Sequence, residues 1–133
     1  MRREIPERPL IAIVDDDKSI RNATQDLLKA AGFSTAAFED AESFLGSASR
    51  ASAACLVTDM RMPGMSGLEL HQELVASGNG IPTVIITAHP EERTQAREAG
   101  ITCYLIKPFT PDELLECVRE ALVKSQAGSI PKS

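Results

Sequence analysis

The sequence contains no tryptophan, and aromatic residues make up only 4% of its 133 residues. Hydrophobic residues nevertheless account for 43% of the chain. A chain of this length buries roughly two thirds of the surface that its unfolded form exposes. We therefore predict a single domain with an aliphatic core.

The sequence also lacks an excess of positive charge, because 14 basic residues stand against 19 acidic ones and the formal net charge is -5. Proteins that bind nucleic-acid backbones need clustered Lys and Arg, so we expect no direct nucleic-acid binding by this chain. No apolar run approaches the ~20 residues of a membrane span. The polar start at residues 1–4 does not resemble a signal peptide. We expect no membrane contact and a cytoplasmic location.

The sequence contains only three cysteines, an odd number: Cys55, Cys103 and Cys117. Each lies in an apolar context, and their spacing does not match that of metal ligands. In a cytoplasmic protein such residues are ordinarily reduced. We therefore predict three reduced, buried thiols.

Five short segments have the composition of strands, and helix-like segments alternate with them. The predicted strands are 10–14, 34–38, 55–58, 83–87 and 103–106, and the predicted helices are 20–31, 40–48, 66–75, 91–99 and 110–124. This alternation predicts an α/β fold in which a single doubly wound parallel sheet has helices on both faces. The small, polar segment 47–52 is interpreted as a loop.

Several predicted helices begin with capping signals. Asp17 and Asp40 can each accept a hydrogen bond from the first turn of the helix that follows. Capping boxes are indicated by Ser66 with a Glu three residues later and by Thr110 with another. The helix 91–99 is the least amphipathic, and its inward candidates are two alanines, Ala96 and Ala99. We expect this helix to be weakly packed.

Four of the predicted strands end at polar residues with chemically useful side chains. These residues are the run Asp15-Asp16-Asp17, then Asp59, Thr87 and Lys107. Ligands of open parallel sheets bind outside the carboxyl ends of the strands. We therefore expect carboxylates, a hydroxyl and an ammonium group to share one edge of the sheet.

The carboxylates at this edge favour a divalent cation. Asp15, Asp16 and Asp59 together carry a charge of about -3 when ionised, and an all-oxygen site with open positions suits Mg²⁺. The alternative is that the Asp run caps the next helix. Asp17 can do so while the other two form the site. Mg²⁺ and Lys107 would neutralise the three carboxylates and nearly neutralise a phosphoryl group on Asp59, which indicates phosphoryl chemistry.

Two further residues have both a functional and an ordinary interpretation. Thr87 can donate a hydrogen bond to a phosphoryl oxygen, or it can be a β-branched residue that ends a strand. Lys107 can face the carboxylates, or it can be a solvated surface lysine. Its place between an apolar strand and Pro108 favours the first interpretation.

Four segments resemble the signature segments of the response-regulator receiver domain, in the family's order and spacing. They are Val14 to Asp17, Val57 to Gly67, Ile85 to Ala88, and Leu105 to Phe109. The resemblance covers residues 9–124, with 1–8 as a flexible lead-in and 125–133 as a tail or the start of a linker. The segment 57–67 is similar to receivers of the FixJ type. The resemblance implies a flavodoxin-like strand order, 2-1-3-4-5.

The resemblance also implies a role for each residue of the site. Asp59 would be the phosphoacceptor. Asp16 and Asp59 would bind Mg²⁺ directly together with the backbone carbonyl of Arg61, while Asp15 would act through water. Thr87 and Lys107 would contact the phosphoryl group, and the Lys107-Pro108 peptide would be cis.

Three residues near the ends of the fourth and fifth strands carry further expectations. Ala88 would offer its backbone to the phosphoryl group and leave that group open to water and small donors. Tyr104 would be the aromatic switch residue, although it can also be a plain core-edge residue. Movement of Thr87 and Tyr104 would alter the surface of the fourth predicted helix, the fifth strand and the last helix. His89 can reach the edge or be incidental.

The expected function is that of a signalling domain that catalyses only its own phosphorylation and dephosphorylation. The phosphoryl donor would be a sensor histidine kinase or a phosphotransfer protein. The output would be a downstream protein or a missing C-terminal domain, with possible homodimerisation through the fourth helix and fifth strand. An alternative is a small phosphatase of the haloacid-dehalogenase type with Asp15 as nucleophile. A third possibility is a pseudo-receiver that serves only as a docking scaffold.

Overall fold

The structure is a computed structural model that describes residues 8–101 and 103–128, with side chains described as far as residue 123. Five parallel strands form one sheet in the order β2-β1-β3-β4-β5. They are β1 (Leu10–Val14), β2 (Ser34–Phe38), β3 (Cys55–Asp59), β4 (Thr83–Thr87) and β5 (Cys103–Ile106). The predicted fold class and strand order are confirmed. The expectations for residues 1–7 and 129–133 lie outside the described residues.

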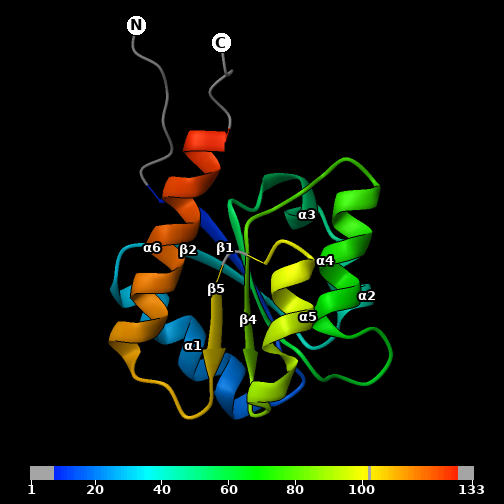
Figure 1. The fold of residues 1–133 in the computed structure, drawn as a ribbon. Coiled ribbons are helices and arrows are strands. Elements are labelled where there is room, and N and C mark those ends of the chain that lie inside the picture. Colours follow the sequence, from blue (N-terminus) through cyan, green and yellow to red (C-terminus); the bar gives the residue numbers. More distant parts are fainter. Residues whose placement is uncertain (1–7, 102, 129–133) are drawn as a thin grey trace, which may run out of the picture.

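The helices connect the strands and cover both faces of the sheet (Figure 1). They are α1 (Lys18–Ala30), α2 (Ala41–Leu45), α3 (Ser49–Ser52), α4 (Gly67–Ala76), the short 3₁₀ helix η1 (Pro90–Glu92), α5 (Arg93–Glu98) and α6 (Pro111–Gly128). The helix predicted over 91–99 is thus η1 followed by α5. Within the described residues, every helix is too short or too polar to cross a membrane.

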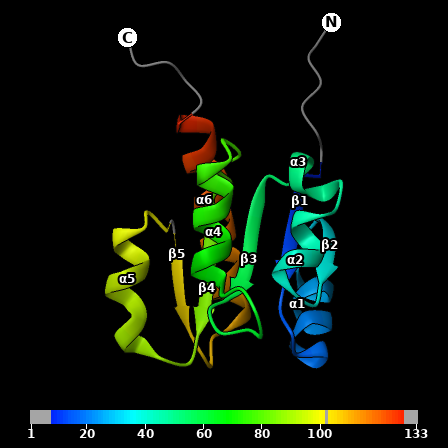
Figure 2. The ribbon, with the colours of Figure 1, turned by 90° about the vertical axis from the view of Figure 1, so that its right-hand side faces the viewer.

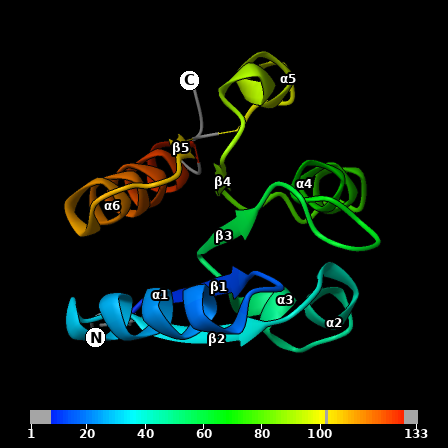
Figure 3. The same ribbon diagram turned by 90° about the horizontal axis from the view of Figure 1, so that it is seen from below.

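Two aliphatic clusters form the core, one on each face of the sheet. Alternate strand residues such as Ile11 and Val57 pack against α1 and α6, which lie together on one face (Figure 3). The residues between them, such as Val14 and Leu56, pack against α2 and α4 on the other face. The central strands β3 and β4 are buried along their whole length. Strands covered on both faces read as continuous apolar runs, which is why their positions were evident in the sequence.

The predicted capping interactions are present at the helix starts. Asp17 accepts a hydrogen bond from the Ile20 amide at 3.1 Å, and Asp40 caps α2 in the same way. Both capping boxes, at the starts of α4 and α6, form with all their reciprocal bonds. These bonds satisfy amide groups that have no partner within the helix, and so they fix where each helix begins.

The helix α5 stands at one edge of the molecule, beyond α4 and next to β5 (Figure 2). Its buried residue is Ala96, and Ala99 just past its end is half-buried, as the sequence predicts. His71 of α4 is buried and contacts the Thr83 hydroxyl at 2.9 Å and the Ala99 carbonyl at 3.1 Å. The end of α5 is therefore anchored to α4 by a hydrogen bond more than by apolar burial.

Three boundary predictions are wrong. The helix predicted over 40–48 ends at Leu45, with Gly46 just past its end. The segment expected to be a loop contains the short helix α3, whose Arg50 donates hydrogen bonds to the Leu45 carbonyl at 3.4 Å and to the Ser77 hydroxyl at 2.7 Å and so holds the turn in place. The last helix runs to Gly128, beyond the expected end at Lys124. The apolar positions that the sequence offers end at Leu122, but once the earlier turns of a helix are formed each further residue adds a backbone hydrogen bond, so the helix can extend past them.

The prediction of three reduced thiols is also wrong. Cys103 of β5 and Cys117 of α6 form a disulfide, with their Cα atoms 5.8 Å apart. Because α6 packs against β5, these two positions face each other although 14 residues separate them in the sequence. Among the cysteines, all of which the structure describes, Cys55 is free and buried in the core. Burial raises the pKa of its thiol to about 12.

Candidate functional site

Four strands deliver the predicted site residues to one edge of the sheet. The register pairs Val14 with Thr58, Asp59 with Ile86, and Thr87 with Ile106, so the strand ends lie at the same level. The arrowheads of the strands in Figure 1 point to this edge. The backbone pairing continues past the sheet, since the Lys107 amide donates to the Thr87 carbonyl at 2.8 Å.

The three carboxylates that the sequence selected come together at this edge. Oxygen atoms of Asp15, Asp16 and Asp59 all lie within 4.8 Å of one another. Asp15 and Asp59 are buried, whereas Asp16 is exposed. Asp17 turns away to cap α1. The Asp run therefore has both of the predicted roles: Asp17 caps α1, and Asp15 and Asp16 face Asp59.

Burial makes this cluster unfavourable for negative charge. It raises the pKa of Asp15 to about 6, although a hydrogen bond from the Asp17 amide opposes the rise. Burial also raises the pKa of Asp59, and Lys107, with its Nζ atom 3.5 Å from Asp59 Oδ2, opposes that rise. One ammonium group does not balance the two buried carboxylates and the exposed one. Such a donor set fits a hard divalent cation bound by oxygen ligands.

Close backbone packing fixes the loop that follows Asp59. The Gly67 amide donates to the Met60 carbonyl at 2.9 Å, and the Met60 amide donates to the Ile86 carbonyl at 2.8 Å. A Cβ atom at Gly67 would collide with the carbonyl group of Asp59. Only glycine therefore lets the start of α4 pack directly behind Asp59.

Thr87 is buried at the end of β4, but its hydroxyl is engaged by a residue that the sequence did not single out. It donates to Glu92 Oε1 at 2.7 Å and accepts a hydrogen bond from the His89 amide at 3.0 Å. The other oxygen of Glu92, Oε2, accepts a hydrogen bond from Arg61 Nε at 2.8 Å and forms an ion pair with Arg61 Nη2 at 2.8 Å. Glu92 thus joins Thr87, at the end of β4, to Arg61, two residues after Asp59.

The remaining candidate residues surround Thr87. Ala88 is exposed and small, so the space beside Thr87 is open to solvent. Tyr104 is half-buried, and its hydroxyl donates to the His89 carbonyl at 2.9 Å. The Arg93 guanidinium lies 5.5 Å from the centre of the Tyr104 ring. The His89 side chain is near Glu91, with 3.4 Å between Nδ1 and Oε2, and has no described contact with the carboxylates.

The comparison with protein families decides the assignment. The family model of the response regulator receiver domain matches residues 11–119. The chain belongs to this family. The match to the receiver family does not favour the alternative that the protein is a haloacid-dehalogenase-type phosphatase.

Relatives and solved structures agree with this assignment. The receiver is 36% identical over 115 residues to the response regulator protein TodT of Pseudomonas putida, covering 85% of this chain and 51% of that protein. It is 34% identical over 121 residues to the transcriptional regulatory protein FixJ of Bradyrhizobium diazoefficiens, covering 90% and 59%. The solved structure of FixJ-N superposes with a TM-score of 0.81 at 31% identity, covering 96% of this chain and 100% of that one. The chain spans about half the length of these two curated relatives.

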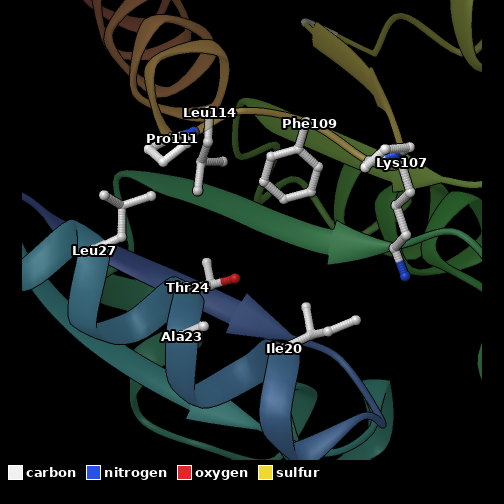
Figure 4. Close-up of a pocket in the computed structure, with 9 residues that line it drawn as sticks. Ile20, Ala23, Thr24, Leu27, Lys107, Phe109, Pro111 and Leu114 are labelled. Atoms are coloured by element: carbon white, nitrogen blue, oxygen red, sulfur yellow. The ribbon is translucent and has the colours of Figure 1, made fainter.

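An apolar groove adjoins the site of this receiver domain. It has a volume of about 650 Å³ and lies between α1 and the start of α6. Leu27, Thr24 and Ile20 of α1 line one wall, and Leu114 and Phe109 face them (Figure 4). Lys107, which follows β5 and precedes Pro108 through the expected cis peptide, lines the end nearest the carboxylates. The groove therefore leads to the site without adding another charged ligand.

Two features of the site have no signal in the sequence. Glu92 is one of two adjacent acidic residues in a polar segment, and 31 positions separate it from Arg61. Arg21 donates from Nη1 to the Asp15 carbonyl at 2.7 Å and so holds the Asp run against α1. Both contacts depend on how loops fold over the sheet edge, which periodicity does not encode.

Proposed function

We propose that this receiver domain is a phosphorylation switch in which Asp59 accepts a phosphoryl group from a sensor histidine kinase. The proposal rests chiefly on one observation: three carboxylates meet within 4.8 Å, with the Lys107 ammonium 3.5 Å from Asp59. A phosphatase of the haloacid-dehalogenase type would place its nucleophile after the first strand, at Asp15, whereas here Lys107 lies against Asp59, which ends β3. Family membership supports the same function.

In the proposed reaction, a carboxylate oxygen of Asp59 attacks phosphorus while the bond from phosphorus to the donor nitrogen breaks. Lys107 is close enough to pair with the phosphoryl oxygens as they approach Asp59. Thr87 would donate its hydroxyl to another of these oxygens, and the backbone of Ala88 would lie beside them. Phosphoryl transfer of this kind depends mainly on positioning and charge stabilisation.

Asp16 and Asp59, with the carbonyl of Arg61, are the proposed ligands of Mg²⁺, and Asp15 would act through water. The bound ion would supply the positive charge that the carboxylates and the phosphoryl group require. The raised pKa values of Asp15 and Asp59 support this assignment, because a cation would favour their ionised forms. The exposed Asp16 would give the ion a path from solvent.

The proposed output is a change in the surface formed by α5, β5 and α6, with Thr87 and Tyr104 as switch residues. Weak packing of α5 supports this choice, since Ala96 is its buried side chain. Homodimerisation through α5 and β5 is one proposed consequence. Contact with a C-terminal output domain or a separate protein is another, because the curated relatives are about twice as long as the matched region. We place this switch in the cytoplasm, where sensor kinases present their phosphohistidine.

Acetyl phosphate provides a direct test of acceptor chemistry without the kinase. We expect the intact mass of the protein to rise by one phosphoryl group when Mg²⁺ is present and to stay unchanged when EDTA removes the ion. The Asp59→Asn variant should show no increase under either condition. An unchanged mass in the wild-type protein with Mg²⁺ would reject the proposal.

A further inference from the structure

Glu92 joins Arg61, two residues after Asp59, to Thr87 at the end of the neighbouring strand β4. Its Oε1 atom accepts a hydrogen bond from the Thr87 hydroxyl at 2.7 Å, and its Oε2 atom accepts one from Arg61 Nε at 2.8 Å and pairs with Arg61 Nη2. We infer that Glu92 is a positioning residue that holds Thr87 in the resting protein and competes with the phosphoryl group for its hydroxyl. This inference rests on the proposed function and adds to it a residue that sets the resting state.

The competition follows from the number of protons on Thr87. A hydroxyl has one proton to donate, and in the structure that proton goes to Glu92. The other contact of the Thr87 oxygen, with the His89 amide, uses a lone pair and leaves the proton unaffected. Thr87 therefore cannot donate to Glu92 and to a phosphoryl oxygen at the same time. Whichever acceptor binds the proton excludes the other.

Glu92 is a strong competitor because it is charged and held from two directions. Its side chain is only 14% exposed, and its carboxylate pairs with the Arg61 guanidinium while it accepts from Thr87. Hydrogen bonds to a carboxylate are roughly twice as strong as those between neutral groups. A phosphoryl group on Asp59 would have to displace this interaction before it could accept the Thr87 proton. The bond to Glu92 thus stabilises the unmodified state.

Release of Glu92 would reach the proposed output surface through the local chain. Glu92 is the last residue of η1, and Arg93, which begins α5, lies against the Tyr104 ring. The Tyr104 hydroxyl is bonded to the His89 carbonyl in the same segment. When the hydrogen bond between Glu92 and Thr87 breaks, the start of α5 can move together with Arg93 and His89, the two residues that contact Tyr104. The opposite end of α5 stays anchored by the His71 bond.

Beryllofluoride, an analogue of the phosphoryl group, allows the competition to be measured at equilibrium. Tyr104 is the only tyrosine and the chain has no tryptophan, so intrinsic fluorescence reports on the residue beside the segment in question. Calorimetric titration in the presence of Mg²⁺ gives the same affinity independently of fluorescence. We expect Glu92→Gln to bind beryllofluoride about tenfold more tightly than wild type, because a neutral amide holds the Thr87 proton less well.

Glu91→Gln is the matched control, since it removes the same charge from the neighbouring position. The Glu91 side chain is 69% exposed and pairs with His89 instead of Thr87. Its affinity should stay within about twofold of wild type. In the Thr87→Val background, which has no hydroxyl to compete for, Glu92→Gln should change the affinity by less than about twofold. This second comparison separates competition for the proton from a general effect of charge.

The outcomes distinguish this inference from the proposed function. If wild type binds beryllofluoride with Mg²⁺ and Glu92→Gln gains less than about threefold, the role of Glu92 is refuted while the phosphorylation site stands. An equal gain in the Glu91→Gln control, or an undiminished gain in the Thr87→Val background, would also refute it. If wild type does not bind beryllofluoride at all, the proposed function itself fails.

Discussion

Replacing Asp15 by Asn should stabilise the metal-free protein. Asp15 is buried beside Asp59, and its pKa is raised from the ordinary value of 3.8 to about 6, chiefly by burial. Each pKa unit corresponds to about 1.4 kcal/mol, so keeping Asp15 ionised at neutral pH costs the folded state at most about 3 kcal/mol. Asn carries no charge, and its side-chain oxygen can still accept the bond from the Asp17 amide.

The pH dependence of this effect has a defined sign. Between about pH 4 and pH 6 the folded protein binds the Asp15 proton more tightly than the unfolded chain does. The free energy of unfolding contributed by this residue therefore falls as the pH rises through that range, and the full cost is present above about pH 6. The advantage of Asp15→Asn should be largest at neutral pH and should disappear below about pH 3, where Asp15 is protonated in both states.

Urea denaturation with EDTA present measures the effect. At pH 7 the variant should gain at most about 3 kcal/mol in free energy of unfolding, or roughly 10 °C in Tm. Asp26→Asn, an exposed change of equal charge on α1, should stay within about 0.5 kcal/mol of wild type. Mg²⁺ should reduce the difference in free energy of unfolding between the variant and wild type, because it binds the wild-type carboxylates more tightly than those of the variant. A variant no more stable than wild type at pH 7, or equally favoured at low pH, would refute the reasoning.

Two further predictions concern packing behind the site and the link between β5 and α6. Gly67→Ala should destabilise the protein by several kcal/mol in urea denaturation and weaken Mg²⁺ binding, because the added Cβ collides with the Asp59 carbonyl; unchanged values for both would contradict the close approach. Reduction of the Cys103–Cys117 disulfide should lower the free energy of unfolding by about 3 kcal/mol, since it closes a loop across 14 positions. Cys103→Ser with Cys117→Ser should match the reduced protein and lose its sensitivity to reductant, and an equally sensitive double variant would argue against this pairing.

The fold and the principal site residues were predictable because both follow from strong local signals. Buried parallel strands appear as apolar runs, and each run here ends at a polar residue that marks the carboxyl edge of the sheet. The run that ends at Asp59 and the capping box at Ser66 fix two neighbouring elements within a few residues. Once the strands are parallel, their carboxyl ends share one edge, and the strand order that the resemblance implied brings Asp15 and Lys107 to Asp59 along it.

The features that were missed depend on contacts between distant residues, which no local pattern in the sequence predicts. The pairing of Cys103 with Cys117 requires knowing which face of α6 lies against β5, and counting cysteines does not supply that. Glu92 belongs to a polar segment, and its partners are distant in the sequence: Arg61 lies in the loop after β3, and Thr87 ends β4. Such hydrogen bonds between distant side chains depend on the exact positions of the loops around them, which the sequence pattern does not determine.

The position of the phosphoryl group is the measurement that tests the central claim most directly. Sodium borohydride reduces an acyl phosphate to an alcohol and so marks the modified carboxyl group permanently. After treatment with acetyl phosphate and Mg²⁺, peptide mass analysis should find this mark at Asp59 and leave Asp15 and Asp16 unmodified. A mark at Asp15 would indicate a phosphatase-like nucleophile after the first strand. A phosphorylated protein with no mark at Asp59 would contradict the account.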